Sequence, residues 1–338
     1  MNHPIGGIVM NCLSLDFGGS SVKYAVVSEN AEILHHGQVA APISSCEVFL
    51  ETVDTLYRSE KHRVSGISLS LPGVIDSSSG MLLSSGAYAS ILAQKNVVQL
   101  ISDRCGVPVA VENDGKCGAL SEAWCGALKD VSCGVVLILG TGIGGGVILD
   151  GKLHHGAGFC AGEFSYVSTE NYGYSLMSQA WMNVGVFGMT YKACKYKNLS
   201  FDVQDAAPLL HKFDPLLCRF FPPVEGESKP IKADGKQILQ WYQQGDADAT
   251  KIYRDLIHSL AVLILNIQLC IAPQRIVIGG GLSRFEPLIS DVEAELAEAY
   301  TGGLMNTTVH SHLVRSSYLA DCNLLGAACN FFQKKGAL

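Results

Sequence analysis

A repeated pattern of apolar strand, glycine-rich turn and second strand most constrains the fold of this 338-residue chain. The first turn occupies residues 16–21 and the second occupies residues 140–146, and an apolar run with β character lies on each side of both. Glycine lets the backbone bend tightly, so consecutive N–H groups can converge on an anion. One such turn is equally typical of an ordinary β-hairpin. Two copies favour a pair of phosphate-binding turns.

The composition excludes several classes of protein. Only 16% of residues are charged and the formal net charge is -7, so the chain lacks the basic surface typical of nucleic-acid binding. Its 48% hydrophobic content and its length allow two domains. The N-terminus has no signal-peptide pattern, and the apolar stretch Leu260–Leu265 is too short to span a bilayer. The sequence therefore predicts a cytoplasmic protein with no nucleic-acid or membrane partner.

The cysteines and histidines do not indicate a structural metal. The 12 cysteines include no C-x-x-C pair and are expected to be small buried residues. Two histidine pairs, His154 with His155 and His310 with His312, have no cysteine or carboxylate at ligand spacing.

Strands and helices alternate along the chain, which predicts α/β layers. The periodicity of apolar residues predicts helices over 47–61, 115–124, 174–194 and 250–271, strands within 11–40, 64–71, 107–111, 134–149 and 275–278, and a further helix over 206–221 inside an irregular stretch at 198–234. Asp114 is the candidate N-cap of the helix that follows it.

The second turn matches G-x-G-x-x-G through Gly140, Gly142 and Gly145. That fingerprint binds dinucleotides only where a helix follows the glycines. Here the run Gly146–Leu149 and an Asp-Gly turn follow instead, which is typical of a hairpin. A dinucleotide-binding fold is therefore disfavoured.

Asp114 is the candidate general base. It ends Val111–Asp114, an apolar strand that finishes in three polar side chains. A carboxylate there can take the proton of a substrate hydroxyl group while the oxygen attacks phosphorus. The alternative is that Asp114 only caps the next helix, and the two roles are compatible.

The motifs together resemble those of the ROK family of sugar kinases and repressors. The motifs that carry the resemblance are, in chain order, 15–23 (LDFGGSSVK), 71–76 (LPGVID), 108–114 (PVAVEND), 140–146 (GTGIGGG) and 276–281 (IVIGGG). They extend over most of the chain. The resemblance implies an actin-like, hexokinase-like ATPase fold made of two α/β domains of ribonuclease-H type with an interdomain cleft. The expected domains are 1–115 with 320–338, and 116–319.

The resemblance also implies roles for individual residues. Asp114 would be the base, and the expected sugar-binding residues are Asn113, Glu163, Tyr166 and Gln179. The expected ATP-binding residues are Asp16, Gly18, Gly19, Ser20, Gly140, Thr141, Gly142, Gly280 and Gly281. Asp16 would face Mg²⁺ through water, and Lys23 is read as a solvent-facing strand residue rather than a phosphate ligand.

One part of the family pattern is missing. Many members follow Ala-Gly-Glu with Ile-Gly-His and a cysteine cluster that binds zinc. Here Ala161–Glu163 is followed by Phe164–Tyr166, and residues 167–180 contain no cysteine. Cys160 alone cannot replace the cluster, so we predict no structural zinc. Tyr166 and Gln179 in place of the family's histidine and glutamate could suit a sugar that carries a substituent.

The sequence thus predicts an ATP- and Mg²⁺-dependent kinase that phosphorylates a hexose, most simply the 6-hydroxyl of glucose or a related sugar. Kinases for a β-glucoside, N-acetylmannosamine or fructose are alternatives within this class. The alternative outside it is a sugar-binding regulator without kinase activity. Because only 15 residues precede Asp16, a DNA-binding helix-turn-helix is not expected. A homodimer is expected from the resemblance.

Overall fold

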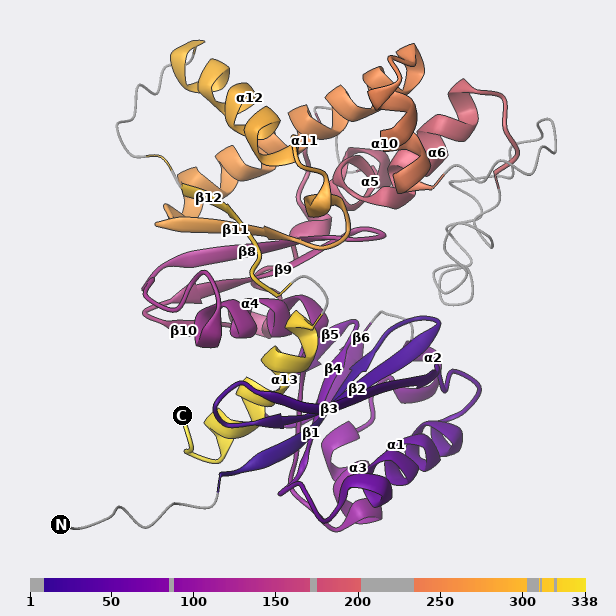
Figure 1. Ribbon diagram of the computed structural model, residues 1–338, viewed down its shortest axis with the longest axis vertical. Helices are drawn as coiled ribbons and strands as arrows, with labels where there is room; N and C mark the ends of the chain where they lie inside the picture. Colours follow the sequence, from indigo (N-terminus) through magenta and orange to yellow (C-terminus); the bar gives the residue numbers. More distant parts are fainter. Residues whose placement is uncertain are drawn as a thin grey trace. The chain divides into compact units, whose positions relative to one another are not determined.

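The structure is a computed structural model that describes residues 9–84, 88–170, 175–201, 234–302, 310, 312–318 and 321–338. The chain packs as two compact units (Figure 1). Unit 1 comprises Met1–Trp124 and Asp321–Leu338, and unit 2 comprises Cys125–Ala320. The predicted helix over 206–221 lies outside the described residues.

Unit 1 is built on a five-stranded sheet in the order β3-β2-β1-β4-β7. Its strands are β1 (Asn11–Phe17), β2 (Ser21–Ser28), β3 (Ile33–Ala40), β4 (Ile67–Leu71) and β7 (Val109–Asn113). The first three strands are antiparallel neighbours, whereas β1, β4 and β7 run parallel. The carboxyl ends of β1, β4 and β7 therefore share one edge of the sheet.

The two faces of this sheet are covered differently. Leu13, Leu15 and Phe17 alternate onto the face packed against α1 (Cys46–Glu60) and α3 (Val97–Cys105). On the opposite face the small residues Ser14 and Ser68 allow α13 (Cys322–Lys334) to approach closely. Their hydroxyl groups donate to carbonyl oxygens of α13, from Ser14 to Leu324 at 2.6 Å and from Ser68 to Ala327. The C-terminal helix thereby completes the unit that the N-terminus begins.

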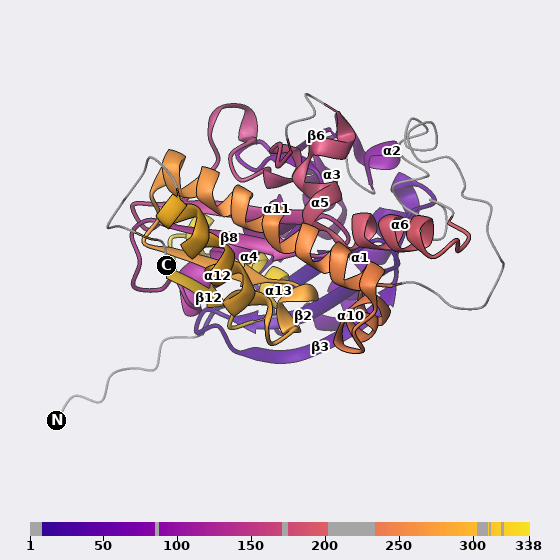
Figure 2. The same cartoon turned by 90° about the horizontal axis from the view of Figure 1, so that it is seen from above.

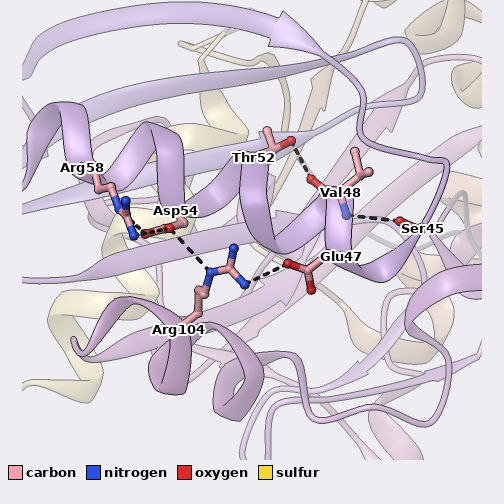
Figure 3. Close-up of polar contacts among 7 residues, drawn as sticks. All are labelled: Ser45, Glu47, Val48, Thr52, Asp54, Arg58 and Arg104. Carbon is pink, nitrogen blue, oxygen red and sulfur yellow. Dashed lines mark hydrogen bonds and ion pairs between the residues drawn. The ribbon is translucent and has the colours of Figure 1, made fainter.

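An ion-pair network joins α1 to α3 (Figure 3). Asp54, 10% exposed, binds both Arg58 of its own helix at 2.9 Å and Arg104 of α3 at 3.5 Å. Arg104 also reaches Glu47 at 2.9 Å. Ser45 caps α1 by accepting the N–H of Val48. The helix begins at Cys46, one residue before the predicted start, and is held against its neighbour by charge as well as by apolar packing.

The remaining elements of unit 1 connect these layers. They are the hairpin of β5 (Val74–Asp76) and β6 (Met81–Ser84), the short helix α2 (Ala89–Leu92), and α4 (Asp114–Cys125), which follows β7 directly.

Unit 2 repeats the strand pattern of unit 1. Its sheet has the order β10-β9-β8-β11-β12, with strands β8 (Gly134–Leu139), β9 (Ile143–Leu149), β10 (Lys152–His154), β11 (Arg275–Gly279) and β12 (His312–Arg315). The strands β8, β9 and β10 are antiparallel neighbours, and β8, β11 and β12 are parallel. The predicted internal duplication therefore extends to strand order and direction, and the predicted β-hairpins at both glycine turns are confirmed.

In the described part of unit 2, five α-helices accompany this sheet. They are α5 (Ala180–Val184), α6 (Val186–Tyr196), α10 (Gly235–Gln243), α11 (Ala247–Ile271) and α12 (Leu288–Gly302). Helix α11 packs against the other four, and Figure 2 shows it running beside α12. Its apolar residues, including Leu256, Leu260 and Leu263, lie in the core.

Helix α11 is longer than the apolar stretch considered above. Among the described residues it is the one helix whose length and composition would suffice to cross a membrane, so the sequence argument from a short stretch was wrong. Half of its most apolar window is buried within the protein, as expected of a core helix.

Most predicted elements are present, with two corrections. The helix expected over 174–194 is two helices, because the chain is extended at Gly185 (φ -90°, ψ 158°). A Cβ there would lie 2.5 Å from the carbonyl oxygen of Trp181 and 2.6 Å from that of Thr141, so only glycine fits. The second correction, at Asp114, concerns the candidate site.

Candidate functional site

The first glycine turn joins β1 to β2 in unit 1. Phe17 and Val22 form the last cross-strand pair, and the N–H of Gly18 donates to the carbonyl oxygen of Ser21 at 3.0 Å. The Tyr88 hydroxyl group donates to the Gly18 carbonyl oxygen at 2.9 Å and fixes the turn from outside. Within the described part of the chain, the N–H groups of Gly19 and Ser20 have no hydrogen-bond partner. These donors fit an anion such as a phosphate group.

Asp16 precedes this turn and is held by two donors. Its Oδ1 accepts hydrogen bonds from Ser70 Oγ at 2.8 Å and from Asn323 Nδ2 at 3.1 Å. Burial raises the pKa of the Asp16 carboxyl group, while these hydrogen bonds and the charge of Lys23 oppose the rise. Both bonds fall on Oδ1, so a cation or its water could approach Oδ2. A hard, oxygen-liganded cation such as Mg²⁺ fits this donor.

Lys23 lies directly opposite Asp16 on β2, and its positive charge reaches that carboxylate. Lys23 is half-buried, and its charge also acts on Asp16, so its role as a solvent-facing residue stays a prediction. Sequence reasoning missed Ser70 and Asn323. Register could have suggested Ser70, because it pairs with Asp16 between the parallel strands β1 and β4. No local signal marks Asn323, which lies 307 residues from Asp16.

The predicted base lies where β7 ends and α4 begins. Asp114 is the first residue of α4, and its Oδ1 accepts the N–H of Gly115 at 2.8 Å and Asn113 Nδ2 at 3.0 Å. The helix is capped by Asn113 instead, because Asn113 Oδ1 accepts the N–H of Lys116 at 3.0 Å. The N-cap role expected of Asp114 was therefore wrong. Because Asn113 already accepts the N–H of Lys116, the Asp114 carboxylate is not needed to cap the helix.

Asn113 is also tied to the Pro-Gly turn after β4. Its Nδ2 donates to the carbonyl oxygen of Gly73 at 3.0 Å, and its side chain is almost fully buried. Since Nδ2 carries two hydrogens, the bonds to Gly73 and Asp114 use both. Asn113 therefore orients the Asp114 carboxylate relative to β4.

The second glycine turn joins β8 to β9 in unit 2. Leu139 and Ile143 close the hairpin, and the carbonyl oxygens of Gly140 and Thr141 accept the N–H groups of Val186 at 3.0 Å and Phe187 at 2.9 Å. These donors are the first residues of α6. Because the carbonyl groups face α6, the turn is anchored by that helix. A strand follows the glycines, which excludes the dinucleotide fingerprint.

Gly280 and Gly281 follow β11. Gly280 has φ +85°, and a Cβ there would lie 2.3 Å from the carbonyl oxygen of Leu139. Only glycine can occupy this position beside the end of β8. A Cβ on Gly281 would meet open space, so a ligand could approach the backbone there.

The expected sugar-binding residues of unit 2 come from one stretch of chain. Glu163 precedes the short 3₁₀ helix Phe164–Tyr166, which the Ser165 hydroxyl group ties to the carbonyl oxygen of Ile143. The side chain of Tyr166 is 58% exposed. Gln179 pairs with Ser168 in an antiparallel bridge, so it lies close to the chain that follows Tyr166.

The later glycines of the second motif serve packing. A Cβ on Gly145 would lie 2.2 Å from the Val136 carbonyl oxygen and 2.8 Å from the Phe164 ring. A Cβ on Gly162 would similarly lie 2.9 Å from the Cα of Gly146. The stretch that carries Glu163 is therefore seated directly on the glycines of β9. Across the described ranges, no group of three or more His, Cys, Asp or Glu side chains could hold a metal ion.

Comparison with solved structures identifies the fold class. A ROK family protein from Streptococcus pneumoniae TIGR4 in complex with sucrose has a TM-score of 0.80 at 24% identity, covering 97% of this chain and 100% of that one. A ROK family glucokinase from Streptomyces griseus in complex with glucose and AMPPNP has a TM-score of 0.72 at 23% identity, covering 94% and 98%. With its duplicated α/β units, the protein has the actin-like, hexokinase-like ATPase fold.

The family follows from the sequence as a whole. The ROK family model matches residues 12–194 and 206–334, and the chain belongs to the ROK family. It is 29% identical to an N-acetyl-D-glucosamine kinase of Haemophilus influenzae over 95% of this chain and 99% of that protein. It is 26% identical to a beta-glucoside kinase of Listeria innocua over 96% and 99%.

Proposed function

We propose that this protein is an ATP-dependent sugar kinase that transfers the γ-phosphoryl group to a hexose hydroxyl group, most simply the 6-hydroxyl of glucose or a related sugar. The curated relatives are sugar kinases, and they align over almost their whole length. The observation that carries the proposal is the carboxylate of Asp114. It lies at the end of a parallel strand, and two N–H donors orient it.

In the proposed reaction Asp114 takes the proton of the sugar hydroxyl group while the hydroxyl oxygen attacks the γ-phosphorus of ATP. The bond from the γ-phosphorus to the bridging oxygen of the β-phosphate breaks, and ADP leaves. The bonds from Asn113 and Gly115 fall on Oδ1 and fix the plane of the carboxylate. Such orientation keeps the base in reach of the hydroxyl without a cost in side-chain entropy during the reaction.

We assign phosphate binding to both glycine turns. The first turn contributes Gly18, Gly19 and Ser20, and the second contributes Gly140, Thr141 and Gly142. Support comes from the unpartnered N–H groups of Gly19 and Ser20 within the described residues. Gly280 and Gly281 would lie against the adenosine. Mg²⁺ bound with ATP would neutralise phosphate charge, and Asp16 would hold it through water.

We assign sugar binding to Asn113, Glu163, Tyr166 and Gln179. Phosphorylation of a β-glucoside, N-acetylmannosamine or fructose is the alternative within the class. The first is supported by the name of a beta-glucoside kinase and the second by that of a putative N-acetylmannosamine kinase of Listeria monocytogenes. A regulator without kinase activity is the alternative outside it; a solved ROK family transcriptional regulator shares the fold at a TM-score of 0.71. We further propose a homodimer that acts in the cytoplasm and holds no structural zinc.

The test is a coupled assay of ADP release with glucose, N-acetylglucosamine, N-acetylmannosamine, fructose and a β-glucoside. Asp114→Ala should lower kcat by about 10²–10⁴-fold, the range of general-base catalysis. Asp103→Ala is the matched control, since Asp103 is an exposed acid of α3 in the same unit. The kinase proposal fails if no sugar stimulates ADP release. Equal turnover by Asp114→Ala would exclude only the proposed base.

A further inference from the structure

Gln179 is held by backbone pairing on both sides. The N–H of Thr169 donates to the carbonyl oxygen of Ser178 at 2.8 Å, and the N–H of Ala180 donates to that of Val167 at 2.8 Å. Gln179 lies between Ser178 and Ala180 and pairs with Ser168. Its backbone is therefore fixed to the stretch that begins just after Tyr166.

Asn183 of α5 clamps this pairing from within the core. Its Nδ2 donates to the Met177 carbonyl oxygen at 2.9 Å and to Thr169 Oγ1 at 3.3 Å, and its Oδ1 accepts Lys192 Nζ at 3.4 Å. The amide can face only one way, because a carbonyl oxygen only accepts and an ammonium group only donates. Asn183 is 4% exposed and Thr169 is 5% exposed. A buried amide with all these partners holds Met177 and Thr169, on the two paired segments, at a fixed separation.

Trp181 fixes the side chain of Gln179. The indole Nε1 donates to Gln179 Oε1 at 3.0 Å. Since the indole nitrogen can only donate, the oxygen of the amide must face it and the NH₂ group must point away. Among the described residues, that NH₂ group has no hydrogen-bond partner. Gln179 therefore presents a donor with a defined direction.

We infer that Asn183 and Trp181 are positioning residues for sugar recognition: Asn183 fixes the backbone at Gln179, and Trp181 turns its NH₂ group towards an acceptor oxygen of the sugar or of a substituent on it. The inference rests on the proposed kinase function. A hydroxyl, ring, glycosidic or carbonyl oxygen can accept from this donor, so the site admits substituted sugars that a carboxylate would exclude.

The variants separate positioning from general stability. Thr169→Val removes the hydroxyl group that Asn183 binds and keeps the shape, whereas Thr169→Ser keeps the hydroxyl group. Asn183→Leu removes the clamp. Trp181→Phe removes the indole donor but retains Cβ, the atom nearest to where a Cβ on Gly142 would lie. Lys195→Ala, at an exposed position of α6, is the control.

The Kd of the sugar is measured by calorimetry without ATP, and the KM values of sugar and ATP are measured by ADP release. Asn183→Leu and Trp181→Phe should each raise the sugar Kd and KM about tenfold, as expected if Gln179 loses its one hydrogen bond to the sugar, and leave the ATP KM unchanged. Thr169→Val should raise the sugar KM about threefold, with Thr169→Ser and Lys195→Ala within about twofold of wild type.

The results distinguish the possible failures. Unchanged sugar Kd and KM in Thr169→Val and Trp181→Phe would overturn the inference, even if their melting temperatures fall. If Asn183→Leu does not fold, the Thr169 pair and Trp181→Phe decide. Wild-type protein that shows no sugar-dependent ADP release would instead refute the proposed function, and the inference with it.

Discussion

Replacing Gly326 by alanine should destabilise unit 1, although alanine is the better helix former. Gly326 lies inside α13, where a Cβ would be 1.7 Å from the carbonyl oxygen of Cys117 in α4. Ordinary contact begins at 3.4 Å. The obstacle is backbone, so a side-chain rotation cannot relieve the overlap and the two helices must separate.

Three contributions set the size of the effect. Helix propensity favours alanine by about 1 kcal/mol. Overpacking against backbone should cost ~3 kcal/mol, the upper end of the usual range. Moving α13 also weakens the bonds from Ser14 to Leu324 and from Ser68 to Ala327, which flank position 326; losing one costs ~1 kcal/mol. The net loss is about 3 kcal/mol in the free energy of unfolding.

Urea unfolding followed by Trp124 fluorescence measures this loss. The Trp124 ring lies 5.9 Å from that of Phe332 in α13, so it reports on the affected packing. Changing Trp181 and Trp241 to phenylalanine leaves it as the sole tryptophan of the three in the chain. Gln333→Ala, at an exposed position of α13, is the control in the same background. A Gly326→Ala protein as stable as the control would refute the reasoning, because propensity would then outweigh packing.

Four further predictions follow from burial and charge. Burial raises the pKa of Asp16, so the folded state favours the protonated carboxyl group. The stability from this group is fully present below the unfolded pKa and is lost as pH rises through the folded pKa. Asp16→Asn should therefore raise the urea midpoint at pH 7, leave it unchanged at pH 3, and abolish activity. Hydrogen bonds led by the Ser78 hydroxyl lower the pKa of Asp76 to about 2, so its stabilising contribution is present above the unfolded value of about 3.9 and is lost as pH falls through 2; Ser78→Ala should raise this pKa in an NMR titration. Iodoacetamide should label the exposed Cys160 and Cys270 before the fully buried thiols, as peptide mass spectrometry would show. Elemental analysis should find no stoichiometric zinc, and one equivalent would contradict the interpretation of the missing cysteine cluster.

Local pattern predicted the elements of the candidate site better than the contacts that support them. Both glycine hairpins and the junction of β7 with α4 were predictable, because strand periodicity and turn residues are local signals. The contact between Asn323 and Asp16 was not, since it depends on how α13 packs on the sheet. The break at Gly185 was missed because part of its surroundings, the carbonyl oxygen of Thr141, is brought near only by the folded chain. Whether the predicted residues bind ATP and sugar stays a prediction.

The two glycine turns illustrate how one local pattern is completed by different tertiary contacts. The Tyr88 hydroxyl group holds the Gly18 carbonyl oxygen, whereas the first N–H groups of α6 hold those of Gly140 and Thr141. Helix N-termini commonly bind phosphate through such N–H groups. In α6, the N–H groups of Val186 and Phe187 already donate to carbonyl oxygens of the turn. The proposed phosphate contact in unit 2 is therefore assigned to the N–H groups of the turn itself rather than to the first N–H groups of α6. Under this proposal the glycines would have a chemical role in addition to their conformational one.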